Sequence, residues 1–198
     1  MPKYFVIYKP FGINSQFSQT ESLKEVGNFP PDVYPVGRLD KDSEGLLLIT
    51  DDKDLNHFLL NPTFKHKRTY LVQVEGEPTE EALRSLEKGV DINLKGIIYR
   101  TKKATAVCPK EIPGVPERNP PIRYRKNIPD SWISLKLQEG KNRQVRKMTA
   151  SVGFPTLRLI RWSIEDLTIE GYGVGEIREF AREEIYSLLH ITKNQFGK

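Results

Sequence analysis

Apolar runs and alternating apolar positions predict strands along most of this chain. The clearest run, residues 46–50, has three leucines and an isoleucine before Thr50. A short continuous run of this kind is typical of a buried strand. The other segments with strand patterns are residues 4–8, 69–75, 132–137, 157–162 and 175–180, with shorter antiparallel strands within residues 90–107.

Apolar residues at helical spacing, bounded by capping residues, predict the helices. Leu55, Phe58 and Leu59 share one face of the first long helix. Asp51 or Asp52 can cap that helix, and the Asn-Pro pair at 61–62 ends it. The other expected helices are a short one at 22–26, one capped by Thr79 and ended by Gly89, one capped by Asn142 that covers 143–152, and one at 182–189.

The order of these elements predicts the fold class. Strands and helices mix without strict strand–helix–strand alternation, so we expect an α+β fold with a mainly antiparallel sheet and flanking helices. A length of 198 residues suits one sizeable core or two small lobes.

Residues 109–131 break the pattern and predict an extended loop, because prolines recur throughout them. The basic residues of this loop permit either a solvated surface or an RNA contact. They are Lys110, Arg118, Arg123, Arg125 and Lys126.

Composition narrows the class of protein. With 37% hydrophobic and 29% charged residues, the chain is expected to be soluble and globular. It has no apolar run near the ~20 residues that span a bilayer and no signal-peptide pattern. Its one cysteine, Cys108, excludes an internal disulfide framework, and a reducing cytoplasm is the expected compartment.

The net charge of +5 suggests a polyanionic partner, and the charges are segregated along the chain. Acidic residues concentrate in residues 75–87 and 176–184. Basic residues concentrate in residues 65–68, 100–103, 118–126 and 141–147. Such a chain could present one basic face to RNA.

Asp40 is the first candidate for chemistry. The Gly-Arg-Leu-Asp sequence at 37–40 places this carboxylate beside Arg38, just before the buried strand at 46–50. An isolated Gly-x-x-Asp is usually a turn or a helix cap. Calcium is a further alternative, because residues 40–45 imitate the first half of an EF-hand loop, but the flanking segments do not read as helices.

Residues 141–147 form the second candidate site. They can be a solvated basic helix face, or a helix start at Asn142 whose amides and flanking cations hold a phosphate. Tyr70 is the third candidate, as either a half-buried strand aromatic or a ring that stacks on an extruded base. The three histidines do not cluster, and the chain has neither a glycine-rich dinucleotide motif nor a Walker motif, so we expect no metal and no nucleotide cofactor.

Four segments, taken in order, resemble the motifs of the pseudouridine synthases of the RsuA/RluA superfamily. They are Tyr-Lys-Pro-Phe-Gly at 8–12, Gly-Arg-Leu-Asp at 37–40 with its following strand, Lys-Arg-Thr-Tyr at 67–70, and the segment 139–148 continuing to residue 161. The Gln-Val-Arg-Lys-Met sequence at 144–148 is similar to the RsuA branch. Because the first motif begins near Tyr4, there is no room for the small N-terminal S4 domain of many RsuA-type proteins.

This resemblance implies a fold and a reaction. The whole chain, 1–198, would be one catalytic domain with two lobes and a central basic cleft. Asp40 would act on a uridine flipped out of RNA, Tyr70 would stack on the base, and Arg146 would pair with Asp40. No cofactor would be needed, and the partner would be ribosomal RNA, most specifically 23S rRNA, bound by a monomer.

The resemblance also implies RNA contacts or local salt bridges for the remaining polar residues of the motifs. They are Lys9, Arg38, Lys67, Arg68, Lys141, Asn142, Arg143, Lys147, Arg158 and Arg161. Two alternatives remain open: a non-catalytic RNA-binding factor of ribosome assembly, and a glycosidase acting on free nucleosides, which would usually use two carboxylates.

Overall fold

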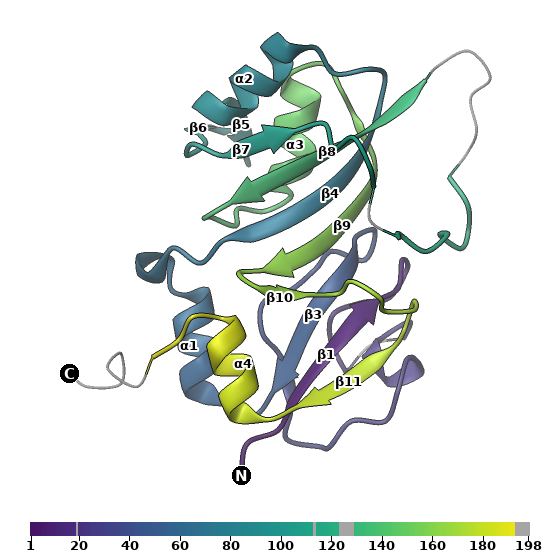
Figure 1. Cartoon of the computed structure of the whole chain (residues 1–198), viewed down its shortest axis with the longest axis vertical. Coiled ribbons are helices and arrows are strands. Elements are labelled where there is room, and N and C mark those ends of the chain that lie inside the picture. Colours follow the sequence, from purple (N-terminus) through teal and green to yellow (C-terminus); the bar gives the residue numbers. More distant parts are fainter. Residues whose placement is uncertain (19, 113, 123–128, 193–198) are drawn as a thin grey trace. The chain divides into compact units, whose positions relative to one another are not determined.

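The computed structural model describes residues 1–18, 20–112, 114–122 and 129–192 (Figure 1). The chain divides into two compact units. Unit 1 comprises Met1–His66 and Arg161–Lys198, and unit 2 comprises Lys67–Ile160. The two lobes expected from the sequence correspond to these units, and each is described by itself.

Unit 1 is built on an antiparallel sheet of strands β11, β1 and β3, in that order. Its elements are β1 (Tyr4–Lys9), the 3-10 helix η1 (Leu23–Glu25), β2 (Tyr34–Pro35), β3 (Glu44–Thr50), α1 (Lys53–Leu60), η2 (Pro62–Phe64), the end of β9 (Thr156–Ile164), β10 (Leu167–Thr168), β11 (Ile177–Phe180) and α4 (Arg182–Leu188). The short strands β2 and β10 pair with β3 and β9. All seven residues of β3 are buried, as its apolar run predicts.

Asp52 joins three elements of unit 1. Its side chain caps α1 by accepting from the amides of Asp54 and Leu55. It also accepts from Tyr4 Oη of β1 at 2.5 Å and from Tyr186 Oη of α4 at 2.8 Å. Burial raises the pKa of Asp52, but these hydrogen bonds and the charge of Arg182 outweigh burial and hold the pKa below its usual value.

Unit 2 contains a second sheet region, in the order β9, β4, β8 and β7. Its elements are β4 (Arg68–Glu75), α2 (Glu80–Lys88), β5 (Asp91–Leu94), β6 (Ile97–Arg100), β7 (Thr105–Val107), β8 (Asp130–Leu137), α3 (Gln144–Ser151) and the start of β9. Strands β4, β8 and β7 pair antiparallel, and β5 and β6 form a separate antiparallel hairpin. The expected α+β fold with a mainly antiparallel sheet is confirmed.

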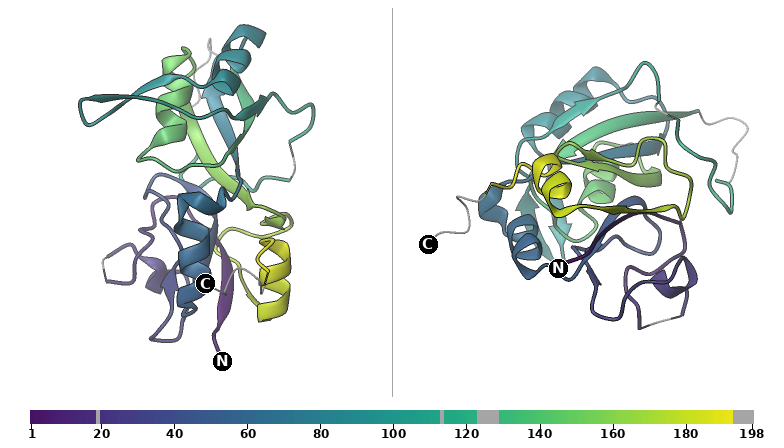
Figure 2. Two further views of the ribbon diagram at one scale, coloured as in Figure 1. Left: turned by 90° about the vertical axis from the view of Figure 1, so that its left-hand side faces the viewer. Right: turned by 60° about the horizontal axis from the view of Figure 1, so that its bottom comes forward.

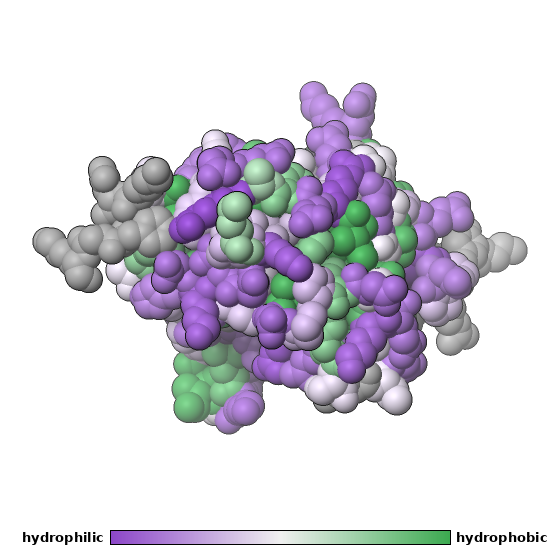
Figure 3. All heavy atoms as spheres, turned by 90° about the horizontal axis from the view of Figure 1, so that it is seen from below, coloured by the Kyte–Doolittle hydropathy of each residue, from purple (hydrophilic) through white to green (hydrophobic). Residues whose placement is uncertain are grey.

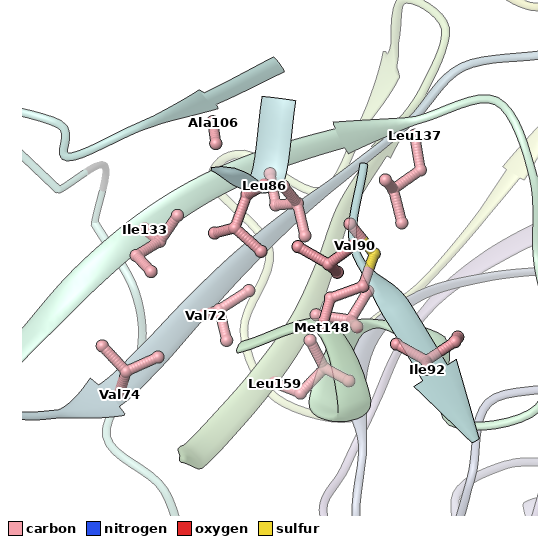
Figure 4. Packing of buried hydrophobic residues seen from close by; sticks show 12 residues of the cluster. Val72, Val74, Leu86, Val90, Ile92, Ala106, Ile133, Leu137, Met148 and Leu159 are labelled. Atoms are coloured by element: carbon pink, nitrogen blue, oxygen red, sulfur yellow. The ribbon is translucent and has the colours of Figure 1, made fainter. Parts of the chain in front are cut away.

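Helices α2 and α3 supply side chains to the core of unit 2 (Figure 4). Leu86 of α2 and Met148 of α3 are both fully buried in one cluster with Val72 of β4 and Ile133 of β8. Thr79 caps α2 by accepting from the Ala82 amide, as expected. Burial of this cluster is the main stabilising contribution in unit 2, at ~25 cal/mol per Å² of apolar surface.

The end of the proline-rich loop differs from that expected. Strand β8 begins at Asp130 rather than Trp132, so the proline-rich loop ends before residue 131. Within its described part, Arg118 donates to the carbonyls of Pro120 and Pro121. Arg123, Arg125 and Lys126 lie outside the described residues.

Hydrophilic residues cover most of the face shown in Figure 3, with separate hydrophobic patches. Among the described residues, no helix is both long and apolar enough to span a membrane.

Candidate active site

Asp40 lies in the loop of unit 1 that leads into β3. Its side chain is half-buried, between the exposed Arg38 and the buried Ser43. The Ser43 amide donates to the Asp40 carbonyl at 3.0 Å, which closes a tight turn directly after the carboxylate. This turn fixes the direction in which the chain enters β3.

The backbone on both sides of Asp40 is bonded to the segment that follows β1. The hydroxyl of Ser15 donates to the Leu39 carbonyl at 2.8 Å and accepts from the Leu39 amide at 3.1 Å. The Gly12 amide donates to the Lys41 carbonyl at 2.9 Å. We call these three hydrogen bonds the Asp40 clamp. Sequence reasoning missed Ser15, because no local pattern signals a contact between residues 24 positions apart.

Lys9 lies at the end of β1, fully buried, and supports the same segment. Its ammonium group donates to the Ile13 carbonyl at 2.6 Å and to the Pro10 carbonyl at 2.8 Å. Burial, with a smaller contribution from Arg161, lowers the pKa of Lys9 to about 8, although Glu44, Asp42 and Asp40 oppose this decrease. The Lys9 charge therefore acts within the same electrostatic environment as Asp40.

Arg161 is the second buried cation of unit 1, with 4% of its surface exposed. Its Nε donates to the Leu46 carbonyl at 2.7 Å, so it contacts the strand that follows Asp40. Glu44, 1% exposed, supplies negative charge near Lys9. For Lys9 and Arg161 the structure favours an internal role, in which each side chain donates to backbone carbonyls.

Unit 2 carries the other candidates of the reaction. Tyr70 is half-buried on β4, opposite Leu135 of β8, and packs against the core of the unit. Arg146 and Lys147 are half-buried on α3, whereas Val145 and Met148 of the same helix are buried. Val145 and Met148 therefore face the core of unit 2.

The start of α3 corrects one expectation. Asn142 is not the N-cap; Arg143 holds that position in the left-handed conformation, with φ at 51°, and its side chain makes no capping hydrogen bond. Gln144 takes over the local bonding, because its Oε1 accepts from the Lys141 amide at 2.9 Å. The residues Lys141, Asn142 and Arg143 are exposed in the turn before the helix.

Glu139 organises this turn and was not recognised from the sequence. It is 7% exposed and accepts from Tyr99 Oη at 2.6 Å, the Lys102 amide at 2.9 Å and Gln144 Nε2 at 2.6 Å. The hydrogen bond to Glu139 and burial raise the pKa of Tyr99 to about 12. Glu139 thus ties the β5–β6 hairpin to the start of α3.

The remaining candidates of unit 2 differ in exposure. Lys67 is exposed and Arg68 is half-buried at the start of β4. Arg158 is 6% exposed and donates to the Pro116 carbonyl at 2.9 Å, which favours an internal role for it as well.

The structure thus groups Lys9, Arg38, Asp40 and Arg161 in unit 1, and the other candidate residues in unit 2. The Asp40–Arg146 pair and the central basic cleft stay predictions. In the part of the chain that is described, no group of three or more His, Cys, Asp or Glu side chains is arranged to hold a metal ion.

Comparison with known proteins gives a consistent set of relatives. Residues 3–151 match the family model described as RNA pseudouridylate synthase. The ribosomal large subunit pseudouridine synthase E of Vibrio parahaemolyticus is 43% identical over 179 residues, which cover 89% of this chain and 73% of that protein. The enzyme of the same name from Xanthomonas axonopodis pv. citri is 47% identical over 170 residues, covering 83% and 87%.

A solved structure supports the fold. A crystal structure of a pseudouridylate synthase matches with a TM-score of 0.76 and 28% identity, over 95% of this chain and 74% of that one. From the sequence alone, the Gly-Lys-Asn-Arg-Gln-Val-Arg segment at 140–146 already resembles ribosomal large-subunit pseudouridine synthase E. The relatives confirm that resemblance.

Proposed function

Because the chain belongs to the RNA pseudouridylate synthase family, we propose that it converts one specific uridine of 23S ribosomal RNA to pseudouridine. The choice of the large subunit rests on one observation, the 43% and 47% identity to relatives named for that activity. The reaction is an isomerisation. It breaks the bond from N1 to C1′ and forms one from C5 to C1′, without net oxidation or reduction, and the proposal invokes no cofactor.

Asp40 supplies the carboxylate in this proposal. It acts either as the nucleophile at C1′ or as the base that takes a proton from C2′. The Asp40 clamp supports this role, because hydrogen bonds to Leu39 and Lys41 restrain the backbone on both sides of the carboxylate. A carboxylate held in this way keeps its reacting geometry without further reorganisation.

Tyr70 and Arg146 act on the same uridine in the proposal. Tyr70 stacks on the extruded base, a contact worth ~1–3 kcal/mol. Arg146 forms a charge-assisted pair with the Asp40 carboxylate. Both side chains are half-buried, so each keeps one side accessible to an RNA substrate.

The exposed cations of the motifs provide phosphate contacts, whereas the buried ones support the protein. Arg38, Lys67, Lys141 and Arg143 are exposed and suit contacts to the RNA backbone, as does the amide of Asn142; the half-buried Arg68 and Lys147 extend this set. Lys9, Arg158 and Arg161 hold backbone carbonyls instead. We propose that the whole chain acts as one catalytic domain, as a monomer, in the cytoplasm.

Tritium release tests this function directly. Pseudouridine formation removes the hydrogen from C5, so 23S rRNA carrying uridine tritiated at C5 should lose a single tritium per molecule to the protein. Asp40→Asn should bind the RNA unchanged and release none. Binding without release by the wild type would indicate the non-catalytic assembly factor, and uracil release from free uridine would indicate the nucleoside glycosidase.

A further inference from the structure

The β5–β6 hairpin carries two adjacent isoleucines that are strongly exposed. Ile97 is 72% exposed and Ile98 is 67% exposed, the highest values among described large hydrophobic residues after Met1. The two strands form a sheet of their own, which projects from the rest of unit 2 (Figure 2, left). Because both side chains remain largely exposed, they contribute almost nothing to the stability of the fold. Folding alone therefore does not explain two adjacent isoleucines at this position.

The hairpin and the segment directly after it are basic. Residues 91–103 contain four exposed cations, Lys95, Arg100, Lys102 and Lys103, and one acidic residue, Asp91. Arg100 lies 3.4 Å from Asp91. Cations surrounding exposed apolar side chains complement a partner that offers both phosphates and accessible bases.

The hairpin is continuous with the basic turn before α3. The Lys141 ammonium lies 5.1 Å from the centre of the Tyr99 ring, and the Tyr99 hydroxyl is bonded to Glu139. Glu139 also accepts from the Lys102 amide at 2.9 Å. Glu139 is buried, so the joined surface presents the exposed cations while this carboxylate is withdrawn from it.

We propose that the β5–β6 hairpin is a second RNA-binding element, which grips the substrate RNA away from the modified uridine. Its lysines hold backbone phosphates, and Ile97 and Ile98 lie against bases at an unpaired or distorted position. This inference rests on the proposed function for the identity of the RNA. It assigns to the hairpin a role in affinity and target choice, and none in the chemical step.

Two variants separate the apolar and the charged contributions. Ile97→Ser with Ile98→Ser should raise the Kd for a full-length 23S rRNA transcript about tenfold to a hundredfold, the effect of losing about one base contact for the pair of side chains. Lys102→Gln with Lys103→Gln should reduce the slope of log affinity against log salt by about 1.4 to 1.8. In both variants, kcat at saturating RNA should stay within about twofold of the wild type, because no hairpin residue takes part in the reaction.

The matched control is Val107→Ser, which changes another exposed apolar residue of unit 2, 47% exposed on β7. Its Kd for the transcript should equal that of the wild type. Unchanged Kd and salt slope in both hairpin variants would overturn the proposal. The proposal would also be overturned if the wild type self-associates in sedimentation and Ile97→Ser with Ile98→Ser abolishes this association. The hairpin would then bind a second copy of the chain rather than RNA. If the wild type releases no tritium but the hairpin variants still lose RNA affinity, the catalytic function fails and the hairpin proposal survives.

Discussion

Removing the hydroxyl of Ser15 should disturb both the stability of unit 1 and the position of Asp40. Ser15 is 4% exposed and Leu39 is 7% exposed, so Ser15→Ala leaves a buried amide and a buried carbonyl without this partner. At ~1–3 kcal/mol for each unsatisfied group, and with some relaxation, the expected loss of unfolding free energy is about 2–4 kcal/mol. Since Leu39 precedes Asp40 directly, we also expect kcat to fall about tenfold to a hundredfold, the effect of misplacing a reacting group by a fraction of an ångström to one ångström.

Urea denaturation and single-turnover kinetics on 23S rRNA measure these two effects. Ser15→Thr keeps the hydroxyl and should recover most of the rate, and Ser18→Ala, at an exposed serine of the same loop, should match the wild type in both assays. RNA affinity should stay unchanged in all three variants. A loss of stability below about 0.5 kcal/mol together with an unchanged kcat in Ser15→Ala would refute the role given to the Asp40 clamp.

Three further predictions concern other parts of the chain. Asp52→Asn should cost about 1.5–3 kcal/mol at pH 7, because hydrogen bonds from Tyr4 and Tyr186 to a charged acceptor are weakened. Because the folded pKa of Asp52 lies below the ordinary 3.8, this stabilisation is complete above pH 3.8 and is lost as the pH falls through the folded pKa. Denaturation of the wild type and the variant from pH 7 to pH 2 should show their difference in unfolding free energy shrinking only at the acid end. Gly89→Ala should lower the free energy of unfolding by about 2 kcal/mol or more, because φ is +90° and a Cβ would meet the Thr101 carbonyl. The control Gly140→Ala, at a position with open space around it, should have a Tm within a few degrees of the wild type in thermal denaturation. Arg146→Ala should lower kcat more than RNA affinity in steady-state assays, and equal losses in both would make Arg146 a phosphate contact instead.

Local signals in the sequence predicted most of the fold. Strand β3, the cap of α1 at Asp52 and the cap of α2 at Thr79 depend on neighbouring residues, and all three are confirmed. The start of α3 was predicted wrongly, because Glu139 draws Gln144 inward and Arg143 adopts a left-handed turn. That arrangement depends on a contact between segments and leaves no local pattern.

The candidate site was predictable in its residues but not in their burial. Lys9 was expected to contact RNA or to form a local salt bridge, yet the pairing of β1 with β3 places it opposite Gly45, and its side chain is fully buried. The contact of Ser15 with Leu39 spans 24 residues, and those of Glu139 with Tyr99 and Lys102 span 40 and 37 residues, so no local pattern predicts them. The family itself was predictable, because four weak motifs in a fixed order are specific where each alone is not.

The most direct test of the central claim is pseudouridine mapping of total RNA, by carbodiimide modification and primer extension, in cells with and without this protein. The deletion should be complemented with the wild type and with Asp40→Asn. The account predicts that a single site in 23S rRNA disappears on deletion and returns only with the wild type. An unchanged map, or a site that Asp40→Asn also restores, would contradict it.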